Sequence, residues 1–209
     1  MKISSNSFTD GAAIPSRYCF ARIAPENHIE LAENLNPHLA WSEFPEDTKS
    51  FLLICVDPDA PSVADDANQE GRSVSASLPR ADFFHWSLFN IPASVTEIAE
   101  GSQCKGVTPQ GKSGPEAPGG MTHGINNYTQ WFAGDADMEG QYFGYDGPCP
   151  PWNDEIPHRY VFSIYALDVE KVDIPESASG QEVYDAVESH VLDGAAITGV
   201  YTLNPSVSA

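Results

Sequence analysis

Four segments rich in β-branched and aromatic residues alternate with stretches that are dense in Gly, Pro, Ser and Asp. They are 50–57 (SFLLICVD), 82–91 (DFFHWSLFNI), 158–169 (HRYVFSIYALDV) and 197–203 (ITGVYTL). This composition and alternation predict β-strands, because such side chains fit a pleated and half-buried surface. The irregular stretches 58–80 and 99–124 are long enough to suggest functional or mobile loops. The pattern therefore predicts one antiparallel β domain.

One helix is predicted near the C-terminus. Ser179 and Glu182 have the spacing of a capping box, in which each side chain accepts a backbone N–H of the other residue. Apolar residues then recur every four positions, and a glycine offers a stop: Val183, Val187, Val191 and Gly194. We expect this apolar stripe to pack on the sheet.

Composition agrees with a single folded domain, residues 1–209. The chain is 41% hydrophobic and 11% aromatic, which argues against disorder, while 17 prolines and 16 glycines suit a loop-rich β protein. The net charge of −20 argues against binding to nucleic acid or to anionic membranes. No signal peptide or membrane-spanning run is recognisable, so a cytoplasmic protein without membrane insertion is expected. The four cysteines are far apart in the sequence and do not have the spacing of a zinc site or of a redox-active pair.

The stretch GVTPQGKS (106–113) formally matches a phosphate-binding loop. Such a loop needs a buried strand before it and a helix after it. Here the preceding residues are polar, and Pro115, Pro118 and several glycines follow, which prevents a helix from starting at Lys112. We therefore expect a surface loop with Lys112 solvated.

Candidate chemistry gathers instead at strand ends. Asp57 and Asp59 follow the first strand in DPDAPS, where the two prolines predict a rigid turn that holds the carboxylates. Strand alternation predicts that His85 shares a face with Ser87, opposite Phe84, Trp86 and Leu88.

The third strand opens with a second histidine. Alternation places His158 and Tyr160 on one face and Arg159 on the other. Taken singly, the aspartates could belong to an ordinary turn, His85 to the core and His158 to the end of a loop. Together they are typical of a constructed pocket.

These residues carry a resemblance to a known family. DPDAP, the histidine of the next strand and GYDGPCPP…HRYVFSIYALD closely resemble the phosphatidylethanolamine-binding protein (PEBP) family. The likeness is greatest to its bacterial and archaeal Raf-kinase-inhibitor-like branch, whose SPHLAW…P…TKSF segment resembles NLNPHLAWSEFPEDTKSF here. It covers nearly the whole chain.

The resemblance implies a large central antiparallel sheet, a smaller sheet packed on it and a few peripheral helices. It also implies a small pocket for phosphate-like head groups. The implied ligand-binding residues are Asp57, Asp59, His85, Pro150, His158 and Tyr160, with Asp59 and the Pro150–Pro151 loop shaping the wall. The sequence departs from the family pattern by enlarged regions at 62–82 and 119–144 and by the insert WNDEI (152–156), which we expect to add acid at the pocket mouth.

Two carboxylates would by themselves repel an anion. They suit an anion pocket only if they favour the charged form of the neighbouring histidines, which then bind the anion. A nearby carboxylate raises the pKa of an imidazole and accepts one N–H, so that the other N–H can point into the cavity. This predicts that phosphate affinity rises as pH falls from 8 to 6.

Three functions remain open. The first is a non-enzymatic, regulatory protein that binds a small anion or phosphorylated group and needs no cofactor. The second is a kinase or protease inhibitor acting through the exposed 58–80 loop. The third is a metal-dependent or acid/base hydrolase using Asp57, His85 and His158. No catalytic or metal motif supports this last function, so we expect no enzyme. Family resemblance also allows a homodimer, which no feature of this sequence demonstrates.

Overall fold

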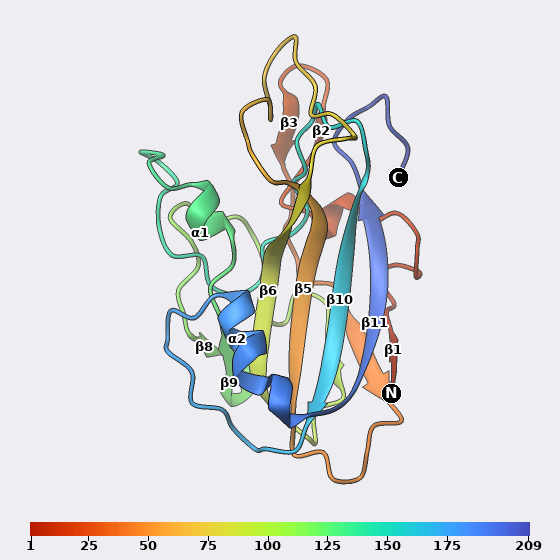
Figure 1. The fold of residues 1–209 in the computed structure, drawn as a ribbon, viewed down its shortest axis with the longest axis vertical. Coiled ribbons are helices and arrows are strands. Elements are labelled where there is room, and N and C mark those ends of the chain that lie inside the picture. The colour runs from red at the N-terminus through yellow and green to blue at the C-terminus, as the bar shows by residue number, and fades with distance from the viewer.

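The computed structural model describes residues 1–209 and is built on a six-stranded antiparallel sheet (Figure 1). Its strand order is β11-β10-β5-β6-β9-β8. The strands are β5 (Ser50–Pro61), β6 (Arg80–Pro92), β8 (Glu116–Ala117), β9 (Met121–His123), β10 (His158–Leu167) and β11 (Val191–Tyr201). The four predicted strands are the four long ones.

Two smaller sheets complete the β structure. The first has the order β1-β4-β7 and comprises β1 (Lys2–Ser4), β4 (Leu39–Ser42) and β7 (Glu97–Ile98). The second is the hairpin β2 (Ala21–Ala24) and β3 (His28–Leu31), which lies at the upper end of the molecule in Figure 1. The helices are α1 (Tyr128–Trp131) and α2 (Gly180–Val187), with 3-10 turns at Ser16–Tyr18, Pro118–Gly120 and Glu188–His190. This mainly β architecture confirms the predicted fold class.

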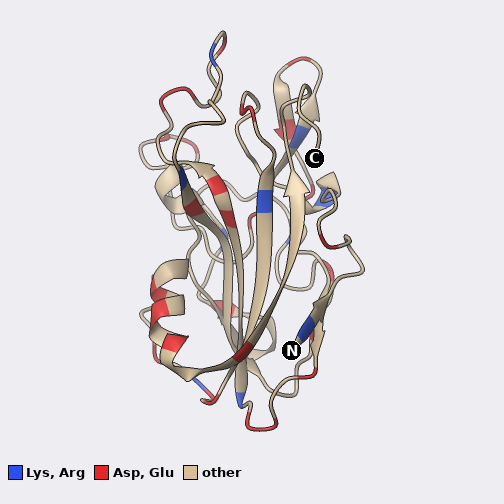
Figure 2. Ribbon diagram, turned by 45° about the vertical axis from the view of Figure 1, so that its right-hand side comes forward, with Lys and Arg blue, Asp and Glu red and all other residues tan.

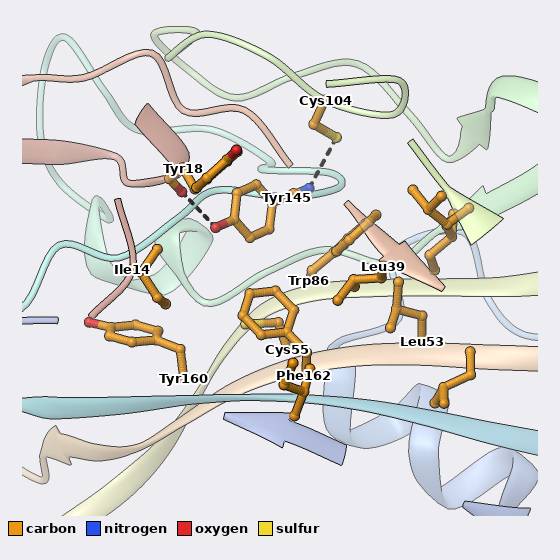
Figure 3. Packing of buried hydrophobic residues seen from close by; sticks show 14 of the residues in the cluster. Ile14, Tyr18, Leu39, Leu53, Cys55, Trp86, Cys104, Tyr145, Tyr160 and Phe162 are labelled. Atoms are coloured by element: carbon orange, nitrogen blue, oxygen red, sulfur yellow. Dashed lines mark hydrogen bonds between the residues drawn. The ribbon is translucent and has the colours of Figure 1, made fainter. Parts of the chain in front are cut away.

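The two faces of the central sheet are covered differently. One face packs against the small sheet and the N-terminal segment around a large apolar core that includes Trp41, Phe51, Trp86 and Phe162. Figure 3 shows part of this core, with the Tyr145 hydroxyl donating to the carbonyl of Tyr18 at 2.6 Å. The other face packs against α2 around a second, smaller cluster. We call these the core face and the α2 face.

The predicted helix starts as expected and ends early. Ser179 and Glu182 form the capping box, and Val183 and Val187 are buried against the sheet. The prediction that the helix continues to Val191 was wrong, because Val191 is the first residue of β11. Gly194 is not a helix stop but pairs with Tyr165 inside the sheet. No helix of the structure is long and apolar enough to cross a bilayer.

Candidate functional site

A cavity of about 370 Å³ opens at the end of the sheet where β5 ends and β10 begins. Its walls are mostly apolar and come from the β2–β3 hairpin, β6, α1 and the segment after it. Five of the six predicted ligand-binding residues line it: Asp57, His85, Pro150, His158 and Tyr160. The structure thus brings these residues together, while ligand binding by them stays a prediction.

Asp57 and Asp59 lie on opposite sides of β5. The DPDAP segment is not a turn but the irregular end of the strand, with a register shift between Asp57 and Ala60. Asp57 faces the cavity, and one of its carboxylate oxygens accepts the N–H of Asp59 at 2.7 Å. Asp59 instead forms a two-pronged ion pair with Arg159, at 2.8 Å for each contact. Asp59 therefore does not line the cavity, which corrects its predicted place.

A β-bulge sets the direction of His85. Cys55 pairs with Trp86 but the next residue, Val56, pairs with Phe84, so His85 is the extra residue in β6. The bulge shifts the alternation, and His85 shares the core face with Trp86. The prediction that Trp86 lies opposite His85 was therefore wrong. Ser87 was also misplaced, since its side chain lies beside Gly124 close to Val183 on the α2 face.

His85 is oriented by the backbone of Asp146. Its Nδ1 donates to the Asp146 carbonyl at 2.7 Å, and its Nε2 makes no hydrogen bond. Burial lowers the pKa of His85, against an opposing influence of the Asp57 charge. His85 is therefore a neutral imidazole near pH 7, with its free nitrogen an acceptor until a proton is added.

The Asp146 side chain is fully buried and anchors this part of the cavity. Its oxygens accept hydrogen bonds from Asn34, Asn126 and Lys112, the last also pairing with its charge. Burial raises the pKa of Asp146, and the Lys112 charge opposes that effect. Lys112 is therefore not solvated as predicted but largely shielded, at 14% exposure, in an ion pair with Asp146. The loop that looked like a phosphate site folds back so that Lys112 also donates to the Tyr145 carbonyl at 3.1 Å.

His158 is held from both sides by carboxylates. Its Nδ1 donates to Asp57 at 2.7 Å, and its Nε2 donates to Asp154 at 3.0 Å. Burial lowers the pKa of His158, but the two hydrogen bonds outweigh it and raise that pKa to about 9. The expectation of a free N–H pointing into the cavity was therefore wrong for this residue.

This arrangement also changes the predicted pH dependence. His158 stays charged between pH 6 and 8, because its pKa is about 9. His85 stays largely neutral over most of the same range, because its pKa lies below the ordinary value. The predicted rise in phosphate affinity from pH 8 to 6 therefore depends on His85 alone, through a proton that it takes up when an anion binds.

The insert WNDEI supplies the second carboxylate. Asp154 is 1% exposed and also forms a two-pronged ion pair with Arg80, at 2.6 and 3.0 Å. Burial raises the pKa of Asp154, but hydrogen bonds from His158 and Arg80 outweigh it, so the pKa is lowered overall. The insert therefore places one of its acids behind His158 rather than at the pocket mouth.

Tyr160 lines the cavity, and among the lining residues its hydroxyl is the one buried side-chain polar atom without a hydrogen-bond partner in the protein. Its side chain follows His158 on the same face of β10, as alternation predicted. Burial and the nearby Asp57 charge raise the pKa of Tyr160, so the group stays a neutral O–H donor. Figure 3 shows its ring projecting from β10.

The cavity therefore offers a small polar floor beneath apolar walls. Around the floor, the Tyr160 hydroxyl can donate and His85 Nε2 can accept or, once protonated, donate. The aromatic side chains of Phe20, Phe83 and Tyr128 enclose it. Such a site suits a small polar group attached to an apolar one.

Sequence reasoning missed three residues that hold the site: Arg80, Asp146 and Asp154. Asp146 lies within GYDGPCPP, and a single acid among buried glycines and aromatics is a detectable sign of a hydrogen-bonded anchor. Arg80 is the first residue of β6 and Asp154 lies 74 residues away in the irregular segment before β10, where no periodicity indicates which residues meet.

Comparisons with known proteins place this cavity in context. The sequence matches the family described as phosphatidylethanolamine-binding protein over residues 4–202. The UPF0098 protein YbhB of Escherichia coli K12 is 30% identical over 202 residues, covering 97% of this chain and 100% of the relative. A UPF0098 protein of Methanothermobacter thermautotrophicus is 32% identical over 201 residues, covering 96% and 98%. The crystal structure of E. coli YbcL, described as a new member of the mammalian PEBP family, has 28% identity and a TM-score of 0.67, covering 96% of this chain and 97% of that one.

Proposed function

Because this chain belongs to the phosphatidylethanolamine-binding protein family, we propose that it is a non-enzymatic protein that binds a small anion such as a phosphate-like head group. A regulatory role through a partner that carries this group is part of the proposal. The apolar walls then accommodate whatever is attached to the anion.

The observation that carries the proposal is the Tyr160 hydroxyl, which is fully buried beside the cavity without a protein partner. A buried polar group without a hydrogen bond costs about 1–3 kcal/mol, so such groups usually mark a function or a bound molecule. An anion would accept this O–H and would also favour protonation of His85, whose free Nε2 would become a second donor.

The same geometry argues against a hydrolase built on Asp57, His85 and His158. A general base or a metal ligand needs a free ring nitrogen, and both nitrogens of His158 already donate to carboxylates. Asp57 is likewise engaged by His158 and by the N–H of Asp59.

The test is Tyr160→Phe, with binding of dimethyl phosphate measured by calorimetry. Hydrogen bonds to charged groups contribute about 1.5–3 kcal/mol, so we expect a loss of affinity of about ten- to a hundredfold. Tyr165→Phe is the matched control, because Tyr165 lies on the same strand but on the α2 face. Equal affinities of the wild-type protein and Tyr160→Phe would overturn the proposed site.

An inhibitory function is a second candidate, favoured by the way loop 62–79 is held. The Asn153 side-chain amide donates to the carbonyls of Asp66, Gln69 and Arg72 at 2.9, 3.3 and 3.1 Å. A pre-ordered loop loses little entropy on binding a protein partner. Deleting the loop would also displace Arg80, which pairs with Asp154 behind the cavity, so a deletion could not separate inhibition from anion binding. The appropriate test substitutes the exposed Val63 by Ser and measures kinase or protease inhibition alongside anion binding.

A further inference from the structure

Four charged groups form a buried row beside the cavity. Asp57, His158, Asp154 and Arg80 follow one another at 2.7, 3.0 and 2.6 Å. Their side chains are between 1% and 12% exposed, so solvent screens them little. The neighbouring Asp59–Arg159 ion pair lies outside the cavity and touches the row only through the backbone of Asp59, whose N–H donates to Asp57 and whose carbonyl accepts from Arg80.

The charges of the row cancel. Two carboxylates face one imidazolium and one guanidinium, so the cavity floor carries no net positive charge. Both N–H groups of His158 are also taken, which leaves its charge without a donor for a ligand. A ligand with two negative charges would lose its hydration on entering the cavity and would find no fixed positive charge there in exchange. The free-energy cost of this desolvation grows steeply with the charge of the ligand.

Asp154 is the removable member of this row. It is held by its own backbone surroundings, since its carbonyl accepts from the Asn204 amide at 2.8 Å and its N–H donates to the Pro151 carbonyl at 3.0 Å. The carboxylate therefore stays at His158 Nε2, outside the lining of the cavity, and takes up one of the two N–H groups of the charged ring. From this position its negative charge cancels one positive charge of the row beside the cavity.

We propose that Asp154 is a specificity-determining residue that makes the cavity prefer singly charged anions over doubly charged ones. The proposal rests on the proposed function and names its ligand class as a monoanion joined to an apolar group. Without the Asp154 carboxylate the row would carry one net positive charge beside the cavity, and a second negative charge on the ligand would then have a fixed countercharge.

The experiment compares two probes of one chemical type at pH 8. Dimethyl phosphate carries one charge, whereas methyl phosphate is mostly a dianion because the second pKa of a phosphomonoester is about 6. Calorimetry gives the affinity of each probe for the wild-type protein and for Asp154→Ala. We expect the wild-type protein to favour dimethyl phosphate and the variant to shift the affinity ratio at least about tenfold toward methyl phosphate, as one additional positive charge beside the ligand allows.

Glu155→Ala is the matched control. It removes an equal charge from the same insert, but Glu155 contacts Ser73 and the N–H of Ala76 rather than His158. We expect its affinity ratio to remain that of the wild-type protein. If Asp154→Ala leaves Arg80 unpaired and does not fold, Asp154→Asn removes the same negative charge and keeps a side-chain oxygen that can accept from Arg80.

The outcomes separate the two proposals. An unchanged ratio in a folded Asp154 variant would overturn the role of Asp154, even if the wild-type protein binds dimethyl phosphate well. A wild-type protein that binds neither probe would count against the proposed function. In that case a gain of methyl phosphate binding in the variant would still support the role of Asp154, and no gain would overturn it.

Discussion

His158 is charged because two buried carboxylates hold both of its nitrogens. Its folded-state pKa of about 9 lies above the ordinary value of 6.5. The resulting stabilisation is therefore fully present below about pH 6.5 and is lost as pH rises through the folded-state pKa. Asp57, Asp154 and, through Asp154, Arg80 are the charged groups that set this value.

We accordingly predict that the free energy of unfolding falls between pH 6.5 and 9 by up to about 3 kcal/mol. Urea denaturation across this range measures the fall, and an NMR titration of the His158 ring reports its pKa directly. In His158→Gln the decline should vanish, because that side chain does not ionise. A ring that titrates near 6.5 would contradict the prediction.

The residues of the site were predictable to different degrees. Strand alternation correctly put His158 and Tyr160 on one face, since β10 is regular over these positions. Alternation could not indicate that Asp154, four residues before His158 in an irregular segment, returns to contact the same ring. That contact depends on a chain path fixed by tertiary hydrogen bonds, which a local pattern does not encode.

At the scale of elements, long strands were predictable and irregularities were not. β5, β6, β10 and β11 carry enough β-branched and aromatic residues to be recognised, whereas β7 and β8 have two residues each. A bulge adds one residue without a clear compositional sign, and the one at His85 reversed the faces assigned to the residues after it.

The start of α2 shows how tertiary packing can outweigh helix propensity. A Cβ at Gly180 would lie 2.2 Å from the ring of Phe84 on β6. Alanine favours helices over glycine by about 1 kcal/mol, so propensity alone predicts that Gly180→Ala stabilises the protein.

We predict the opposite sign for Gly180→Ala. Overpacking of a filled interface typically costs about 1–3 kcal/mol, which exceeds the propensity gain at the end of a helix. Thermal or urea unfolding measures the difference. Gln181→Ala, exposed on the same turn, should change stability by no more than about 0.5 kcal/mol. A stabilised Gly180→Ala would show that α2 shifts freely on the sheet.

At the scale of the whole molecule, the acidic charge is largely uncompensated. Figure 2 shows Asp and Glu spread over loops, helix and strands, with few Lys and Arg between them. Of the ten Lys and Arg, seven already form ion pairs: Lys2, Arg17, Arg22, Arg72, Arg80, Lys112 and Arg159. The net charge of −20 therefore repels itself across the folded surface.

Self-repulsion on this scale predicts that moderate salt stabilises the protein and improves anion binding. The screening length falls from about 30 Å at 0.01 M to about 8 Å at 0.15 M, which removes most repulsion between separated carboxylates. Urea denaturation should therefore give a larger free energy of unfolding at 0.15 M than at 0.01 M sodium chloride, and equally so in tetramethylammonium chloride. A gain limited to sodium would indicate specific cation binding instead. Because the same field repels an anion from the cavity, dimethyl phosphate affinity should also rise over this range, measured with a salt whose anion is too bulky to enter the cavity. A constant or falling affinity in that salt would contradict the prediction.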